Sequence, residues 1–214
     1  MYKAVIFDYD FTLGDSAEGI AASCNYALGK MGCMEKTDKE IRRTIGLSLG
    51  EVFRELTGND DGAAAKRFTA LFRERADKVM TDSAVMYADA LPTLEELKRR
   101  GLKTGIVTSK FHYRIDEILR KFGAESLVGA IIGGDDVSRE KPDPEGLIRA
   151  LELLGTEKGE ALYVGDSHVD ALAARSAGVP FAAVLTGTTE DFSEFAPVIV
   201  AENLREVLEF VIKI

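Results

Sequence analysis

Six short apolar runs recur along the chain and alternate with segments of helical pattern. The runs are rich in Val, Ile and Ala, and they lie at Ala4–Phe7, Thr104–Thr108, Ala130–Ile132, Ala161–Val164, Phe181–Leu185 and Val198–Val200. Short runs that are apolar at every position are typical of strands buried on both faces. The segment PTLEELKRR, which begins at Pro92 and ends before Gly101, carries the start and stop signals of a helix. The alternation therefore predicts an α/β fold with a parallel sheet covered by helices on both faces.

The interval from residue 15 to residue 84 differs, because it has helical periodicity and no convincing strand. Its segment Thr37–Glu40 matches a capping box, which marks a helix start. A later segment places four apolar residues along one helical face, namely Phe68, Leu71, Phe72 and Val79. We therefore expect a helical cap domain at 15–84, inserted into a Rossmann-like α/β core made of residues 1–14 and 85–214.

Composition excludes some classes of function. The net charge of −9 and the pI of about 4.9 argue against a protein that covers nucleic acid or an anionic membrane surface. No apolar stretch is long enough for a signal peptide core or a membrane span, so a cytoplasmic protein is predicted. Cys24 and Cys33 are expected to be reduced packing residues. Oligomeric state cannot be inferred from the sequence.

Polar side chains follow several of the predicted strands. In an open parallel sheet, ligands bind beyond the carboxyl ends of the strands. The residues found there are Asp8 and Asp10 after the first run, Thr108, Ser109 and Lys110 after the second, and Asp166 and Asp170 after the fourth. Asp8, Asp10 and Thr12 also alternate with apolar residues, so an extended backbone would point all three to the same side.

These residue types fit phosphoryl transfer assisted by a metal ion. Neighbouring carboxylates repel one another unless a cation neutralises them, and oxygen ligands of this kind suit Mg²⁺. Asp8 could then act as a nucleophile, and Asp10 could act as general acid and base. Thr108 or Ser109 could donate hydrogen bonds to the phosphoryl oxygens. Lys141 lies between prolines in KPDP, a stiff turn that can fix a cation near a phosphate.

Four ordered segments resemble the four motifs of the haloacid dehalogenase (HAD) superfamily. They are DYDFTLGDS, GIVTSK, KPDPEGL and YVGDSHVDALAARSAG, and the helical insert resembles the cap of that superfamily. Within it the chain is most similar to phosphoglycolate phosphatases and to their pyrophosphatase and sugar-phosphate mutase relatives. The resemblance implies a Mg²⁺-dependent phosphatase that acts on a small phosphorylated metabolite through an aspartyl-phosphate.

The resemblance also implies a role for individual residues. Asp8 would be the nucleophile and a metal ligand, Asp10 the general acid and base and a metal ligand through its carbonyl, and Asp166 a further metal ligand. The phosphate would be held by Thr108, Ser109 and Lys141, with Asp170 and Thr12 in support. Residues Ile45, Gly46, Leu47 and Ser48 of the cap would contribute to substrate selection.

Two residues depart from the pattern of the superfamily. Phe11 stands where Gly is usual, and Ser109 stands where Asn is frequent. Phe11 removes the conformational freedom that Gly gives a turn, so we expect it to shape the pocket without abolishing activity. Ser109 keeps a hydrogen-bonding group with a shorter reach.

Several alternatives stay open at this level. An inorganic pyrophosphatase, a nucleotidase and a β-phosphoglucomutase-like phosphomutase would share these residues, and a non-catalytic binding protein could share the fold. Gly46–Gly50 fits the G-x-S-x-G pattern of a serine esterase with Ser48 as nucleophile, although a charged helical segment precedes it. His112 and His168 lie beside the motifs, and their roles are undetermined. A calcium loop is excluded, since Leu13 and Gly19 occupy positions that require Gly and Glu.

Overall fold

A computed structural model describes residues 1–213, which divide into two compact units. One unit comprises Met1–Asp15 and the chain from Met86 onward, and the other is Ser16–Val85. The expected boundaries lie one residue away from this division. The chain passes between the units at strands β2 (Gly14–Asp15) and β3 (Val85–Met86), which pair as a two-stranded sheet. The sequence does not predict these strands, because two residues are too few to show an alternating pattern.

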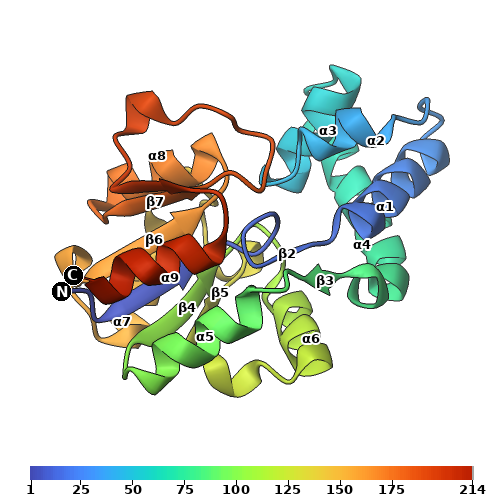
Figure 1. The fold of residues 1–214 in the computed structure, drawn as a ribbon. Coiled ribbons are helices and arrows are strands. Elements are labelled where there is room, and N and C mark those ends of the chain that lie inside the picture. The colour runs from blue at the N-terminus through green and yellow to red at the C-terminus, as the bar shows by residue number, and fades with distance from the viewer. Residues whose placement is uncertain (214) are drawn as a thin grey trace. The chain divides into compact units, whose positions relative to one another are not determined.

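The first unit contains a six-stranded sheet in the order β5-β4-β1-β6-β7-β8, with all neighbours parallel (Figure 1). Its strands are β1 (Ala4–Phe7), β4 (Lys103–Val107), β5 (Ala130–Ile132), β6 (Ala161–Gly165), β7 (Phe181–Val184) and β8 (Ile199–Ala201). The predicted fold class is thereby confirmed. The predicted bounds of β1 and β5 agree with the structure, and the other strands differ by one residue at one or both ends.

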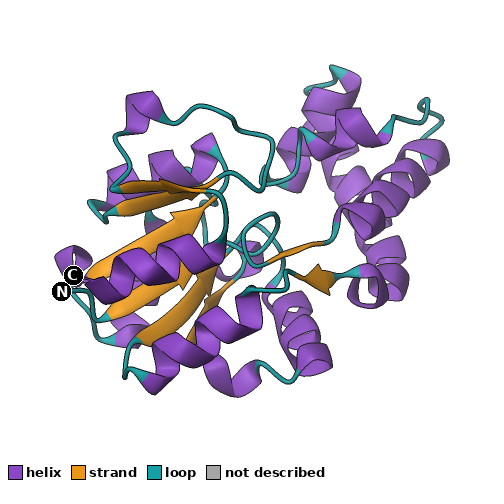
Figure 2. Ribbon diagram, in the orientation of Figure 1, coloured by secondary structure: helices purple, strands orange, loops and turns teal. Residues whose placement is uncertain are grey.

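Helices cover both faces of the sheet (Figure 2). The helices of this unit are α5 (Ala90–Arg99), α6 (His112–Phe122), α7 (Glu145–Leu154), α8 (His168–Ala177) and α9 (Leu204–Lys213). Short 3-10 turns lie at Glu125–Leu127, Gly134–Asp136, Lys158–Glu160 and Ser193–Phe195. Helices α5 and α9 contact each other on one face, and α7 and α8 contact each other on the opposite face.

Alternate residues of the central strands point toward the layer of α7 and α8. Ile6 of β1 and Tyr163 of β6 belong to the same buried cluster as Leu147 of α7 and Ala174 of α8. This cluster is apolar apart from the hydroxyl of Tyr163, which needs a polar partner when it is buried. The orientation of Tyr163 is important for the site described below.

The second unit is helical, and its core combines aliphatic residues with a group of phenylalanines. Its helices are α1 (Ala17–Lys30), α2 (Asp38–Arg42), α3 (Leu49–Thr57) and α4 (Gly62–Ser83). The ring of Phe68 lies 5.4 Å from that of Phe53 and 6.2 Å from that of Phe72, measured between centroids. The buried stripe of α4 continues through Ala76 and Met80, whereas the predicted Leu71 and Val79 flank it and are partly exposed.

Two local predictions can be checked directly. Thr37 caps α2 in a capping box with Glu40, as its sequence pattern predicts. Cys24 and Cys33 are free cysteines, and burial raises the pKa of the Cys24 thiol to about 12. Among residues 1–213, no helix has the length and apolar character needed to cross a membrane.

A tight turn follows β1 and replaces the extended backbone that the alternation suggested. The carbonyl of Tyr9 accepts hydrogen bonds from the amides of Thr12, Leu13 and Gly14 at 3.2, 2.9 and 3.0 Å. Phe11 adopts a left-handed conformation with φ of +58°, and its side chain is buried. Phe11 thus takes, at a steric cost, the conformation that Gly would favour. Its expected effect on the shape of the pocket stays a prediction.

The strain at Phe11 can be separated from the loss of its ring. Phe11→Ala and Phe11→Gly both remove the buried ring, at a cost of about 3–5 kcal/mol. At a positive φ, Gly lacks the steric penalty of Ala, so the Gly variant is expected to be more stable by about 1 kcal/mol. Urea denaturation of the two variants measures this difference. Equal stability, or a more stable Ala variant, would contradict the inferred strain.

Candidate active site

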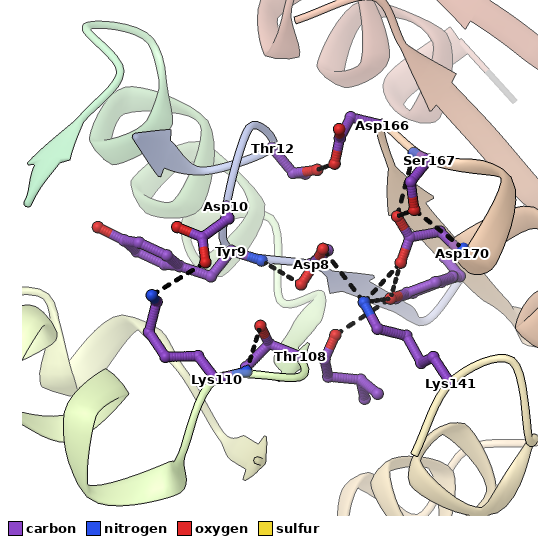
Figure 3. A network of polar contacts seen from close by, with 12 residues as sticks. Asp8, Tyr9, Asp10, Thr12, Thr108, Lys110, Lys141, Asp166, Ser167 and Asp170 are labelled. Atoms are coloured by element: carbon purple, nitrogen blue, oxygen red, sulfur yellow. Dashed lines mark hydrogen bonds and ion pairs between the residues drawn. The ribbon is translucent and has the colours of Figure 1, made fainter. Parts of the chain in front are cut away.

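Segments that follow the carboxyl ends of β1, β4, β5 and β6 bring the predicted polar residues together in the first unit (Figure 3). Since β1 lies between β4 and β6, residues that follow these strands are neighbours in space. The residues buried there are Asp8, Asp10, Thr12, Thr108, Lys141, Asp166 and Asp170. Thr108 was predicted as the last residue of its strand, and it lies one residue beyond β4.

Lys141 is the central cation of the cluster. Its ammonium lies 3.1 Å from Oδ2 of Asp8 and 2.6 Å from Oδ1 of Asp170. The side chains of Lys141 and Asp8 are 4% and 3% exposed, so water screens this pair little. Lys141 comes from the segment before α7, and Asp170 is in the first turn of α8.

Tyr163 also contacts Lys141, and sequence reasoning did not identify it. Its hydroxyl lies 3.2 Å from the Lys141 ammonium, 2.8 Å from Oδ1 of Asp170 and 3.0 Å from the carbonyl of Val107. An apolar run with a Tyr in its middle gives no sign of this role. The hydroxyl of Tyr163 reaches Lys141 only because this side chain points to the face of the sheet that α7 and α8 cover.

Asp170 already has partners on both of its carboxylate oxygens. Oδ1 accepts from Lys141 and Tyr163, and Oδ2 accepts from the hydroxyl and the amide of Ser167 at 2.5 and 3.2 Å. Ser167 and Asp170 form the capping box of α8. This geometry suits a residue that orients Lys141 better than one that binds a ligand directly.

The Asp166 carboxylate accepts fewer hydrogen bonds than the Asp170 carboxylate. Its Oδ1 lies 3.4 Å from the hydroxyl of Thr12, a long hydrogen bond. The backbone of Gly187, in the loop after β7, lies so close that a β-carbon there would be 1.8 Å from Oδ2 of Asp166. Oxygen atoms of Asp8, Asp166 and Asp170 all lie within 4.8 Å of one another. A buried group of carboxylates this compact is suited to a hard divalent cation, which prefers oxygen ligands.

Burial and the charges of neighbouring carboxylates raise the pKa values of Asp8 and Asp166. Burial is the largest effect that raises the pKa of Asp8 to about 6, and Asp170 and Asp10 add to it. The charge of Lys141 opposes this shift. Burial, followed by the charges of Asp170 and Asp8, raises the pKa of Asp166 well above its usual range.

The pKa of Lys141 moves in the direction that favours its charged form. Burial acts to lower this pKa, but the charges of Asp170 and Asp8 together outweigh burial and raise it. Lys141 therefore stays an ammonium at neutral pH. The cluster keeps one fixed positive charge among carboxylates that repel one another.

The loop after β4 adds a second lysine. The ammonium of Lys110 lies 2.9 Å from Oδ2 of Asp10, and the two side chains are 7% and 9% exposed. The amide of Lys110 donates to the hydroxyl of Thr108 at 3.3 Å. Ser109, the expected phosphate contact, is partly exposed, and its hydroxyl has no hydrogen-bond partner within residues 1–213. The sequence places Lys110 at this edge of the sheet but does not predict its contact with Asp10.

Both histidines contact residues outside the group of Asp8, Asp166 and Asp170. Nδ1 of His112 lies 2.6 Å from Oδ2 of Asp136. Nε2 of His168 lies 3.0 Å from the carbonyl of Asp191, and its ring packs against Phe192 and Phe195. These contacts connect neighbouring loops and assign neither histidine to the site.

Residues Ile45, Gly46, Leu47 and Ser48 lie in the turn between α2 and α3. Ser48 caps α3, and its hydroxyl lies 2.7 Å from Oε2 of Glu51 in a capping box. A nucleophile elbow requires a strand before the serine, but α2 and a turn precede Ser48. The esterase alternative is therefore wrong. The role of this turn in substrate selection stays a prediction.

The close approach of Gly187 to Asp166 predicts that a larger residue at position 187 weakens metal binding. In Gly187→Ala the new methyl group must displace the Asp166 carboxylate or the loop, so affinity for a divalent cation should fall about 10-fold to 100-fold. Calorimetric titration of chelator-treated protein with Mg²⁺ measures the change. Gly159→Ala is the matched control, because a β-carbon at Gly159 meets no atom within 4 Å. Equal affinities in the two variants would contradict the prediction.

The raised pKa of Asp8 predicts how stability varies with pH in the metal-free protein. The folded pKa of about 6 exceeds the usual 3.8, so stability from this group is present below pH 3.8 and lost as pH rises through 6. The Asn side chain in Asp8→Asn does not titrate between pH 4 and pH 8, so the variant does not lose this stability. The variant should match the wild type near pH 4 and exceed its unfolding free energy by up to about 3 kcal/mol near pH 8.

Denaturation in EDTA across this pH range tests the expectation. Asp60→Asn serves as the control, because the Asp60 side chain is 82% exposed. If the unfolding free energies of wild type and Asp8→Asn vary with pH in the same way, the ionised Asp8 does not destabilise the fold.

Comparison with known proteins places this geometry in a family. Residues 5–184 match the family described as haloacid dehalogenase-like hydrolase. Phosphoglycolate phosphatase 1 of Pseudomonas aeruginosa is 32% identical, over 96% of this chain and 78% of that protein. Pyrophosphatase PpaX of Bacillus velezensis is 30% identical, over 96% of this chain and 94% of that protein.

Solved structures agree in fold. A structure described as a haloacid dehalogenase-like hydrolase from Bacteroides fragilis is 38% identical, with a TM-score of 0.94 over 97% of this chain and all of that one. A structure described as a phosphatase from Clostridium difficile has a TM-score of 0.82 at 28% identity, over 98% of each chain. With the family match spanning most of its length, the chain belongs to the haloacid dehalogenase-like hydrolases.

Proposed function

We propose that the protein is a Mg²⁺-dependent phosphatase that hydrolyses a small, phosphoglycolate-like phosphomonoester through an aspartyl-phosphate on Asp8. Its relatives in the family include proteins named as phosphoglycolate phosphatases and pyrophosphatases. The enzyme is thus a hydrolase of phosphoric monoester bonds. The observation that supports Asp8 most directly is its position 3.1 Å from the Lys141 ammonium and within the cluster of three carboxylates.

Asp8 and Asp166 would hold the metal ion with their carboxylates, and Asp10 would contribute its backbone carbonyl. Asp170 is assigned a supporting role, because its oxygens are engaged by Lys141, Tyr163 and Ser167. Mg²⁺ is the ion that best fits oxygen ligands together with a substrate phosphate. When bound, it neutralises charge on the carboxylates and on the phosphoryl oxygens.

In the first step, a carboxylate oxygen of Asp8 attacks phosphorus and the bond from phosphorus to the leaving oxygen breaks. Asp10 gives its proton to that oxygen, so the alcohol leaves neutral and Asp10 becomes a carboxylate. The amide of Tyr9 donates to Oδ1 of Asp8 at 2.7 Å, which fixes the orientation of the nucleophile. Lys141 and Thr108 donate to the phosphoryl oxygens, where charge accumulates in the transition state.

In the second step, water attacks phosphorus and the bond from phosphorus to the Asp8 oxygen breaks. Asp10 accepts the proton of this water, so phosphate leaves and both aspartates return to their starting forms. The helical unit Ser16–Val85 would act as the cap that excludes bulk water and selects the substrate. Within it, the turn at residues 45–48 is assigned to substrate contact.

A phosphatase assay with Asp8→Asn tests this function. Activity toward phosphoglycolate should require Mg²⁺ and should fall to background in Asp8→Asn, because an amide cannot form the acyl phosphate. Asp10→Asn should lose about 10²-fold to 10⁴-fold, the usual contribution of a general acid and base. Phosphate release is measured with and without EDTA, and pyrophosphate is included as a second substrate.

Asp60→Asn is the matched control for the exchange of Asp for Asn, because this exposed residue lies in the helical unit. Metal-independent turnover by the wild type, or turnover by Asp8→Asn at the wild-type rate, would refute the mechanism.

A further inference from the structure

Two lysines approach the aspartates of the site from different segments. Lys141 precedes α7 and contacts Asp8 at 3.1 Å, whereas Lys110 follows β4 and contacts Asp10 at 2.9 Å. In Figure 3 the labelled side chains of Asp8 and Thr108 are drawn between the two ammonium ends. The proposed mechanism uses Lys141 and assigns no role to Lys110.

The position of Lys110 places it on the side of the leaving group. In the proposed function, Asp8 receives the phosphoryl group and Asp10 faces the oxygen that leaves. A cation at Asp8 therefore serves the transferred phosphoryl group, while a cation at Asp10 lies beside whatever the leaving oxygen is attached to. A lysine that contacted only phosphoryl oxygens would be expected beside Asp8.

The surroundings of Lys110 fix its ammonium before any substrate arrives. Its side chain is 7% exposed, and its nitrogen lies 5.9 Å from the centroid of the buried Tyr9 ring. An ammonium has three N–H donors, so contact with Asp10 and contact with a bound anion are compatible. Where water is scarce, attraction between an ammonium and an anion is stronger than at the surface.

We infer that Lys110 is a specificity-determining residue that binds a second anionic group on the leaving side of the substrate. This inference rests on the proposed function, and it narrows the substrate class. The favoured substrates are phosphate esters or anhydrides in which a carboxylate or phosphate lies next to the leaving oxygen.

The short distance from Lys110 to Asp10 limits where that anionic group can be. Asp10 makes one hydrogen bond to the leaving oxygen and another to the Lys110 ammonium. The leaving oxygen therefore lies within about 6 Å of that ammonium. The anionic group must itself lie within about 3 Å of the ammonium. A carboxylate one carbon from the leaving oxygen, or a phosphate bonded directly to it, meets both limits. A neutral alkyl group at this position has no electrostatic attraction to Lys110, so this cation does not increase the affinity for such a substrate.

Phosphoglycolate and ethyl phosphate form a matched pair of substrates, because a carboxylate in the first replaces a methyl group in the second. The wild type should have the higher kcat/KM for phosphoglycolate. Lys110→Met removes the charge with little change in side-chain length. It should reduce the ratio of the two kcat/KM values at least 10-fold (~1.4 kcal/mol). Most of this change should come from a higher KM for phosphoglycolate. Lys110→Arg should keep most of the ratio. Lys121→Met, at an exposed position of α6, is the control.

A binding measurement keeps this test separate from catalysis. Asp8→Asn protein is titrated calorimetrically with each ester, alone and combined with Lys110→Met. Tighter binding of phosphoglycolate that is lost in the double variant supports the role of Lys110, even if turnover fails and the proposed function falls. An unchanged preference, or an equal loss for both esters, overturns the inference, since Lys110 would then act through Asp10 alone.

Discussion

The contact of Lys141 with Asp8 and Asp170 is the interaction on which the site depends. Carboxylates withdrawn from water repel one another, and burial of each charge costs several kcal/mol unless a partner compensates. Lys141 lies within 3.1 Å of Asp8 and 2.6 Å of Asp170, so one ammonium offsets part of the repulsion at both. Loss of this cation would leave buried charges unpaired, which is far more destabilising than loss of a surface ion pair.

The position of Lys141 follows from packing below it. The helix α7 lies so close to the sheet that a β-carbon at Gly146 would be 2.9 Å from Cγ1 of Val107. That close approach fixes the segment before α7, from which Lys141 extends. From the sheet, Tyr163 places its hydroxyl 3.2 Å from the ammonium and 2.8 Å from Asp170. The charge at the edge of the sheet is thus supported by side chains of the apolar core.

The sequence predicts most of the scaffold and the residues of the site, but few of the contacts between them. Strands such as Ala4–Phe7 are continuous apolar runs, and the parallel arrangement brings the polar residues after them to one edge. The roles of Tyr163 and Gly187 could not be predicted, because they depend on which face a strand residue occupies and on how closely a distant loop approaches. The pairing of Lys110 with Asp10 likewise depends on rotamers, which a linear pattern does not encode.

The turn after β1 explains how one short segment serves three parts of the site. In an extended strand, Asp8, Asp10 and Thr12 would point in one direction, toward a single neighbour. In the turn they reach different partners: Asp8 contacts Lys141, Asp10 contacts Lys110, and Thr12 lies 3.4 Å from Asp166.

The direction of Thr12 relative to the two aspartates depends on the left-handed conformation of Phe11, which costs on the order of 1 kcal/mol for a residue other than Gly. Hydrogen bonds across the turn to Tyr9 and Gly14 maintain that conformation, as is common where strain lies beside a functional site. The burial of the Phe11 ring adds apolar contact that Gly would lack, so the departure at this position keeps the turn and strengthens its packing.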